Sequence, residues 1–141
     1  MNNDTIRHIE LETHQTKDIS DGHVNGSLTV IWRDWDNHEL ELPKMVYITS
    51  VEPKEKKGPH LHTERNSFFT CIQGEVTFII KDSKNIFHEI KLSETKPQLI
   101  FIPKGVPAAH INTGTITGKI LALADISWLS LIHISEPTRP Y

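Results

Sequence analysis

The most informative parts of the chain are Lys57-Gly58-Pro59-His60-Leu61-His62-Thr63-Glu64 and, past Gly74, Pro103-Lys104-Gly105-Val106-Pro107-Ala108-Ala109-His110-Ile111-Asn112. In an extended strand His60 and His62 have the same parity, so both imidazoles are expected on one face. His110 belongs to a distant strand, which can bring it beside them inside a barrel. Three converging imidazoles suit either a divalent metal ion or proton transfer near neutral pH.

Short β-forming runs surround these stretches, and turn residues break them at the spacing that is typical of an all-β sandwich or barrel. The clearest run includes Val76, Phe78 and Ile80, which share one parity and are expected to face the core. No stretch has a helical 3.6-residue period, so helix is expected to be scarce. Further strands are expected over 26–32, 45–51, 68–72, 86–92, 99–102 and 119–126.

The composition narrows the class of protein. A chain of 141 residues fits a single domain. Its 15 basic and 18 acidic residues give a formal charge of -3, which argues against a nucleic-acid-binding protein. The apolar runs are too short to span a bilayer, so no membrane partner is expected. Cys71 is the single cysteine and the opening residues lack an apolar leader, so a cytoplasmic protein is expected.

The last residues need a separate interpretation. Residues 129–139 read Leu-Ser-Leu-Ile-His-Ile-Ser-Glu-Pro-Thr-Arg and resemble a translated sequencing adapter. We therefore expect one domain over 1–128, truncated at its C-terminal end, and an artefactual tail over 129–141. The alternative is a genuine tail that contains two prolines. His133 is left out of every site hypothesis for this reason.

The two stretches resemble the motifs of the cupin superfamily. The first cupin motif holds H-x-H, an acidic residue and a glycine turn, and the second holds P-x-G and a histidine. The resemblance implies an all-β, single-domain jelly roll (a double-stranded β-helix) with a pocket in the barrel mouth. Cupin metal sites usually take a Glu at a position where this chain has Asn66 or Ser67. The usual second-motif histidine corresponds to Ala108, with His110 two residues further on.

A closer resemblance is to the nucleotide-sugar branch of the cupins. It rests on residues 26–31, 43–47, 57–62 and 120–125, which occur in the same order there, and it covers about 21–128. These segments are similar to those of the sugar 3,4-ketoisomerases and the proteins related to dTDP-4-dehydrorhamnose 3,5-epimerase. The resemblance implies a homodimer that acts on a dTDP-linked 4-keto-6-deoxyhexose without a metal. Such a reaction belongs to deoxysugar biosynthesis for surface polysaccharides or glycosylated products.

The resemblance also implies roles for individual residues. Either His60 or His62 abstracts the proton next to the sugar ketone, and Tyr47 lines the same pocket. The reaction needs a base with a pKa near the working pH and a donor that stabilises the enolate oxygen. No cofactor is required, because the ketone itself acidifies the neighbouring C–H bond. The candidate substrate-binding residues are Lys57, Arg65, His110 and Lys104.

Two other functions are compatible with the sequence. One is a metal-binding cupin, a small oxygenase or metal isomerase, that holds a divalent metal ion with His60, His62 and His110. The other is a cupin that binds a sugar without catalysis. The fold alone does not distinguish among them, because cupins host many chemistries.

Overall fold

The computed structural model of the protein describes residues 5–35 and 42–125. Over these residues the chain forms strands and loops, and no helix there is long and apolar enough to cross a membrane. The tail expected at 129–141 lies outside the described residues. The strands are β1 (Arg7–Glu10), β2 (Thr13–Lys17), β3 (Val24–Thr29), β4 (Met45–Val51), β5 (Lys56–His60), β6 (Ser67–Gln73), β7 (Glu75–Lys81), β8 (Phe87–Ser93), β9 (Gln98–Ile102), β10 (Ala108–Asn112) and β11 (Gly118–Ala124).

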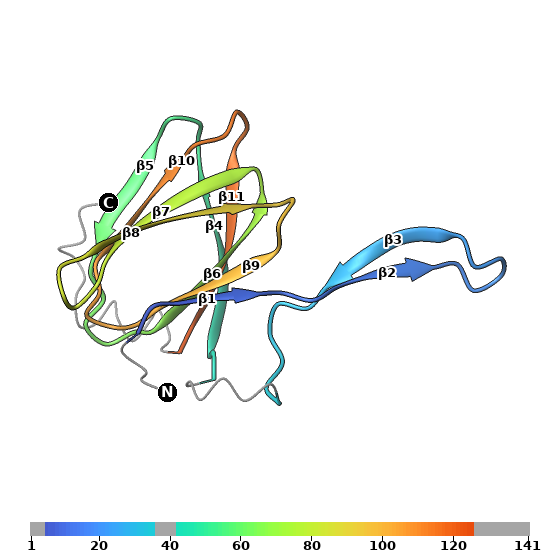
Figure 1. Ribbon diagram of the computed structural model, residues 1–141, viewed down its shortest axis with the longest axis horizontal. Coiled ribbons are helices and arrows are strands. Elements are labelled where there is room, and N and C mark those ends of the chain that lie inside the picture. Colours follow the sequence, from blue (N-terminus) through green and yellow to red (C-terminus); the bar gives the residue numbers. More distant parts are fainter. Residues whose placement is uncertain (1–4, 36–41, 126–141) are drawn as a thin grey trace.

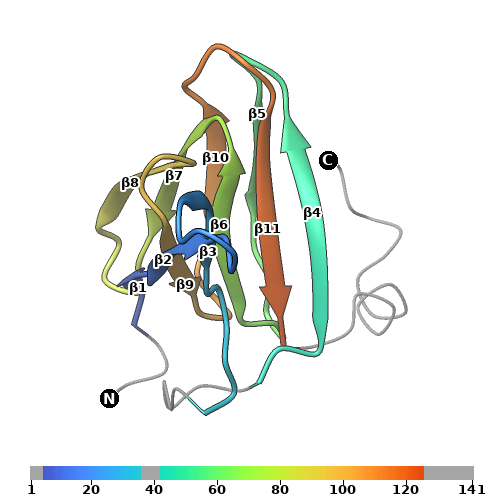
Figure 2. The same ribbon diagram turned by 90° about the vertical axis from the view of Figure 1, so that its right-hand side faces the viewer.

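The strands build two sheets that face each other, with a separate hairpin at one side (Figures 1 and 2). One sheet has five strands in the order β1-β9-β6-β11-β4, and the other has four in the order β5-β10-β7-β8. The pairs within both sheets are antiparallel. The prediction of an all-β fold is confirmed, and the two-sheet arrangement is that of a jelly roll.

The main core lies between the two sheets. Val76, Phe78 and Ile80 of β7 are fully buried, as their alternation predicts. Ile100 of β9 and Ile120 of β11 belong to the same cluster and come from the opposite sheet. Burying each such side chain contributes about 1.5–3 kcal/mol, so this layer holds the sheets together.

A second apolar layer covers the outer face of the five-stranded sheet. Phe68, Leu99, Phe101 and Leu123 are buried there. Trp32, which follows the hairpin in sequence, packs edge-on against Phe68 with ring centroids 4.7 Å apart. This contact fastens the segment after the hairpin to the body of the barrel.

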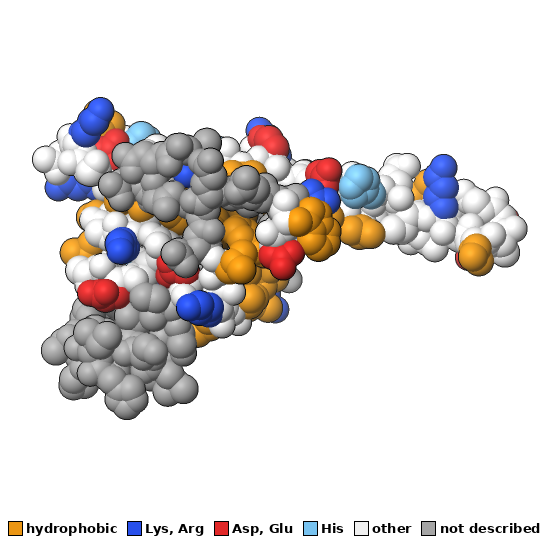
Figure 3. Space-filling view, turned by 90° about the horizontal axis from the view of Figure 1, so that it is seen from below, with side chains coloured by type: hydrophobic (Ala, Val, Ile, Leu, Met, Phe, Trp, Pro, Cys, Tyr) orange, Lys and Arg blue, Asp and Glu red, His pale blue; other side chains and the backbone are white. Residues whose placement is uncertain are grey.

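The hairpin of β2 and β3 projects from the body as an arm (Figures 1 and 3). Its two strands pair antiparallel, with His14 opposite Leu28 and Thr13 opposite Thr29. Most of its side chains are exposed, including the apolar Val24 and Leu28. Hydrophobic side chains also gather on the body beside the root of the arm (Figure 3). The hairpin therefore contributes little to the hydrophobic core and leaves apolar side chains exposed to solvent.

The observed strands agree with most of the expected ones. β4 has the expected bounds, and β6, β8, β9 and β11 begin or end within about two residues of the expectation. The run expected over 26–32 is shifted, since β3 ends at Thr29. β1, β2 and β10 are not among the ranges predicted from the sequence. These strands are four or five residues long, too short to show an apolar alternation.

Gly58 holds β5 against β10. Its φ is +96°, in the left-handed region, and a Cβ there would lie 2.9 Å from the Ala108 carbonyl oxygen and 3.0 Å from the His60 nitrogen. Both neighbours are backbone atoms and have little freedom to move away. Gly105 also has a positive φ, +82°, but a Cβ there would meet nothing within 4 Å. The two glycines thus share backbone strain and differ in available space.

We expect Gly58→Ala to destabilise the protein more than Gly105→Ala. The left-handed conformation costs about 1–2 kcal/mol in either alanine variant. Only the Gly58 variant adds a backbone clash, so its loss should exceed that range. Urea unfolding of both variants and the wild type measures the difference, and equal losses would contradict this account of Gly58.

Candidate active site

A cavity of about 540 Å³ opens between the two sheets. Its size lies within the usual range for small-molecule pockets, which is about 300–1,000 Å³. Strands from both sheets supply its wall, together with the loops that follow β5 and β9. The lining residues are Met45, Tyr47, Thr49, Lys57, His60, His62, Arg65, Ser67, Phe69, Phe78, Ile102, Pro103, Val106, Ala108 and His110.

The period-two alternation of β4 supplies one wall of the cavity. Met45, Tyr47 and Thr49 point inward and are partly buried, whereas Val46 and Ile48 between them are exposed. The predicted site residue Tyr47 therefore lies in the pocket. Its two inward neighbours were not predicted as site residues, although the same alternation places them there.

His60 and His62 both line the cavity, but the prediction that they lie on one face of the same strand holds only in part. β5 ends at His60, so His62 lies in the following loop rather than on the same strand. The Gly105 backbone N–H donates to the His62 carbonyl over 2.7 Å and holds this loop in place. The two imidazole centroids are 6.3 Å apart. A loop bond, not strand parity, therefore brings the second imidazole into the pocket.

Lys57 enters the cavity from β5. Its Nζ donates a hydrogen bond to the Thr49 hydroxyl over 2.8 Å. Lys57 also lies opposite His110 in the β5–β10 register. The bond to Thr49 holds the ammonium group at the inner wall, where a point charge can meet an anionic ligand group.

Arg65 is a buried cation in the same pocket. Its side chain is 4% exposed, and its Nη2 donates to His62 Nε2 over 2.8 Å. The guanidinium carbon also lies 5.9 Å from the centroid of the Tyr47 ring. A guanidinium has no acceptor, so His62 Nε2 accepts this bond and the ring is neutral, with its proton on Nδ1.

His110 lies deeper in the pocket. Its ring packs on Phe78 with centroids 5.1 Å apart, and its buried Nε2 has no hydrogen-bond partner among the described residues. Burial is the largest cause that lowers the pKa of His110 from 6.5 to about 4, and the nearby Lys57 and His60 act in the same direction. This imidazole is therefore neutral at physiological pH.

Two residues near the motif do not reach the cavity. Lys104, a predicted substrate-binding residue, is exposed and is not among the lining residues. Asn66 turns its side chain away: its Nδ2 donates to Asp125 Oδ2 over 2.7 Å, and its Oδ1 accepts from the Lys104 backbone N–H over 2.8 Å. Asn66 thus ties three segments together beside the site.

The pocket histidines do not fit a divalent metal ion. Among residues 5–35 and 42–125, the one group of three His, Cys, Asp or Glu side chains with ligand atoms within 4.8 Å of one another is Asp18, Asp21 and His23. His60, His62 and His110 do not form such a group. The lone pair of His62 Nε2 already accepts from Arg65, whose positive charge opposes a nearby cation.

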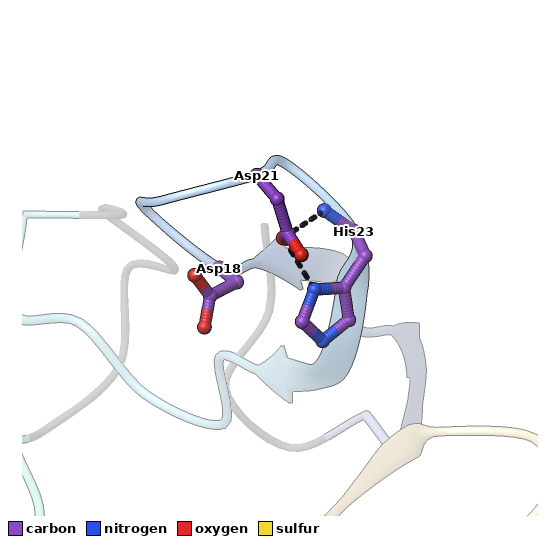
Figure 4. Close-up of side chains that lie close together, drawn as sticks. All are labelled: Asp18, Asp21 and His23. Atoms are coloured by element: carbon purple, nitrogen blue, oxygen red, sulfur yellow. Dashed lines mark hydrogen bonds and ion pairs between the residues drawn. The ribbon is translucent and has the colours of Figure 1, made fainter.

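The group of Asp18, Asp21 and His23 stabilises the hairpin turn (Figure 4). Asp18 accepts from the backbone N–H and the hydroxyl of Ser20. Asp21 bonds to both the backbone N–H and the ring Nδ1 of His23. These hydrogen bonds lower the pKa values of both carboxyl groups. The carboxylates are thus already used by the turn that connects β2 to β3.

Solved structures with the same fold support the cupin interpretation. A dTDP sugar isomerase from Desulfovibrio desulfuricans G20 aligns with a TM-score of 0.73 at 17% identity, covering 86% of this chain and 76% of that chain. A 3,4-ketoisomerase from Helicobacter canadensis aligns with a TM-score of 0.68 at 18% identity, covering 87% of this chain and 84% of that chain. The 3,5-epimerase RmlC from Legionella pneumophila Philadelphia 1 was solved in complex with dTDP-4-keto-L-rhamnose. It aligns with a TM-score of 0.74 at 13% identity, covering 87% of this chain and 68% of that chain. These likenesses show that the protein has the same fold as those isomerases and epimerases.

The family follows from the sequence itself. A family profile described as "FdtA: WxcM-like, C-terminal" matches residues 8–136, which is most of the chain. The protein belongs to this family. A comparison with curated protein sequences finds no match. The predicted resemblance to the nucleotide-sugar branch of the cupins is confirmed.

The neutral state of buried His110 predicts a pH-dependent stability. In the unfolded chain this imidazole takes up a proton near pH 6.5, but in the folded protein only near pH 4. The contribution of neutral His110 to the free energy of unfolding is therefore fully present above about pH 6.5. It is lost as the pH falls toward 4. Between about pH 6.5 and 4.5 the loss is on the order of 3 kcal/mol, because one pKa unit corresponds to about 1.4 kcal/mol.

Urea unfolding at about pH 7.5 and pH 4.5 measures this effect. We expect His110→Gln to lose less stability on acidification than the wild type. His14→Gln, which changes an exposed histidine on β2, is the matched control and should behave as the wild type. An equal acid loss in His110→Gln and the wild type would contradict the burial argument.

Proposed function

We propose that the protein is a cofactor-independent isomerase or epimerase that enolises a dTDP-linked 4-keto-6-deoxyhexose. The observation that carries the proposal is the pair of imidazoles 6.3 Å apart in a cavity that also holds a tyrosine and a buried guanidinium. Family membership and the fold shared with nucleotide-sugar isomerases and epimerases support it. We place the reaction in the cytoplasm, supported by a free, buried Cys71.

The residues of the pocket match the demands of enolisation. A neutral imidazole takes the proton from the carbon beside the ketone, and the C–H electron pair becomes the C=C bond of the enolate. The carbonyl π electrons move to oxygen, where a positive or hydrogen-bond-donating group stabilises them. Return of a proton to the opposite face of the same carbon gives the epimer. Protonation of the former carbonyl carbon, with loss of the neighbouring hydroxyl proton, moves the ketone instead.

The charge of the lining suits a nucleotide-linked substrate. Lys57 and Arg65 are cationic, and the described lining contains no Asp or Glu. A diphosphate is an anion that such a site attracts, even though the chain as a whole carries a charge of -3. The size of the cavity accommodates a hexose ring with space for part of the linked nucleotide.

Hydrogen–deuterium exchange tests the proposed reaction. The full chain is incubated with dTDP-4-keto-6-deoxyglucose in deuterated water and followed by proton NMR. We expect loss of a sugar ring proton signal, and the position that exchanges separates ketoisomerase from epimerase. The double variant His60→Gln/His62→Gln should lose exchange by about 100- to 10,000-fold, the usual contribution of a general base.

His14→Gln is the matched control, because His14 is an exposed histidine on the hairpin. It should exchange as the wild type does. Wild-type protein that binds the nucleotide sugar without exchange would make it a sugar-binding cupin instead. Exchange that requires added metal and stops with a chelator would favour the metal-binding alternative.

We further propose that the protein is a homodimer. The edge strand β4 pairs only with β11 in the described part of the chain, and its outward Val46 and Ile48 are 59% and 58% exposed. An edge strand with an apolar outer face is a ready site for another chain. The projecting hairpin, with exposed Val24 and Leu28, supplies a second apolar surface.

Light scattering after size exclusion tests the dimer. We expect the wild type at twice its chain mass of 16.1 kDa, and Val46→Lys/Ile48→Lys at the monomer mass. Ile86→Lys is the control, since Ile86 is also exposed but precedes β8 on the other sheet. A monomeric wild type, or a double variant that remains dimeric, would contradict the assignment of this face.

A further inference from the structure

Arg65 is a buried charge whose hydrogen-bonding capacity is mostly unused. Its one hydrogen bond among the described residues goes to His62, and its Nε and Nη1 are buried without a partner there. No carboxylate in residues 5–35 and 42–125 forms an ion pair with it. Because arginine stays protonated at any working pH, the charge cannot be relieved by losing a proton.

Such an arrangement is unfavourable in the protein alone. A buried ion without a counter-charge carries a desolvation penalty of several kcal/mol, and buried N–H groups without acceptors add to it. Buried charges without a protein counter-charge are expected mainly at functional sites. Because Arg65 lines the cavity, a ligand is the natural source of the missing acceptor. The acceptor has to be an oxygen that carries negative charge.

The position of Arg65 indicates which oxygen this is. Its guanidinium touches one imidazole of the histidine pair and lies 5.9 Å from the Tyr47 ring. It is therefore at the end of the cavity where the proposed proton transfer occurs. The other cation in the lining, Lys57, enters from β5 and is bonded to Thr49. Negative charge that develops beside the histidines is the charge of an enolate.

We propose that Arg65 binds the ketone oxygen of the substrate and stabilises the enolate oxygen through its guanidinium group. This inference rests on the proposed function and assigns the oxyanion-binding residue within it. The chain has this arginine three residues past His62, in the loop and not on a strand.

The hydrogen bond between Arg65 and His62 also implies different roles for His60 and His62. His62 Nε2 accepts from Arg65, so its lone pair is not available to take a proton there. His62 is a positioning residue that orients the guanidinium, and His60 is the base. A glutamine at position 62 keeps an acceptor for Arg65, whereas a leucine does not.

Kinetics of exchange in Arg65 variants test the assignment. We expect Arg65→Gln to lower the exchange kcat by about 100- to 1,000-fold, the usual effect of removing one oxyanion donor. Affinity for dTDP, measured by calorimetry, should stay within about threefold of the wild type. Arg65→Lys keeps the charge and should lose less. The melting temperature of Arg65→Gln should be no lower than that of the wild type, because an unpaired buried charge has been removed.

The histidine variants complete the test. His60→Gln should abolish exchange, His62→Gln should retain part of it, and His62→Leu should resemble Arg65→Gln in its kcat. Wild-type exchange with an unchanged Arg65→Gln kcat would overturn the inference and leave the proposed function standing. So would a loss confined to dTDP affinity, which would assign Arg65 to the diphosphate. Absence of exchange in the wild type would overturn both.

Discussion

The pairing of β10 with two neighbours is the constraint on which the candidate site depends. On one side Ala108 lies opposite His60 and His110 opposite Lys57, and on the other side His110 lies opposite Phe78. The register shifts between Ala108 and His110, so the strand bends where it passes the cavity. One short strand thereby sets the positions of two imidazoles and one ammonium group. The close approach of β5 to the Ala108 carbonyl is possible only because residue 58 has no Cβ.

The loops that complete the pocket are held by hydrogen bonds rather than by the sheets. The backbone N–H of Gly105 fixes the carbonyl of His62, and Asn66 links the same loop to Asp125 and to the segment after β9. Because both ends of the loop are held by hydrogen bonds, the Nη2 atom of Arg65 lies 2.8 Å from the Nε2 atom of His62 inside the barrel. Asn66, one of the two positions at which the cupin resemblance would place a metal-ligating Glu, serves this structural link.

Much of the fold follows from local pattern, whereas the site follows from it only in part. The alternation of β7 and the apolar run of β4 are long enough to identify strands and faces from sequence alone. The His60-x-His62 motif identifies the pocket, but not that the strand ends at its first histidine. Arg65 carries no periodic signal, and its burial depends on contacts with residues distant in sequence. The hairpin arm is likewise invisible to apolar periodicity, because both of its faces are mostly exposed.

The features that prepare the pocket for chemistry are those that oppose stability. His110 is held neutral mainly by burial, which lowers its pKa to about 4. Arg65 carries an unpaired charge in the same space, with hydrogens directed at no protein acceptor among the described residues. A cavity whose lining contains two cations is electrostatically suited to a developing anion. In the proposed reaction, a substrate that becomes negative at its ketone oxygen would relieve this imbalance most fully in the enolate, where catalysis needs the binding energy.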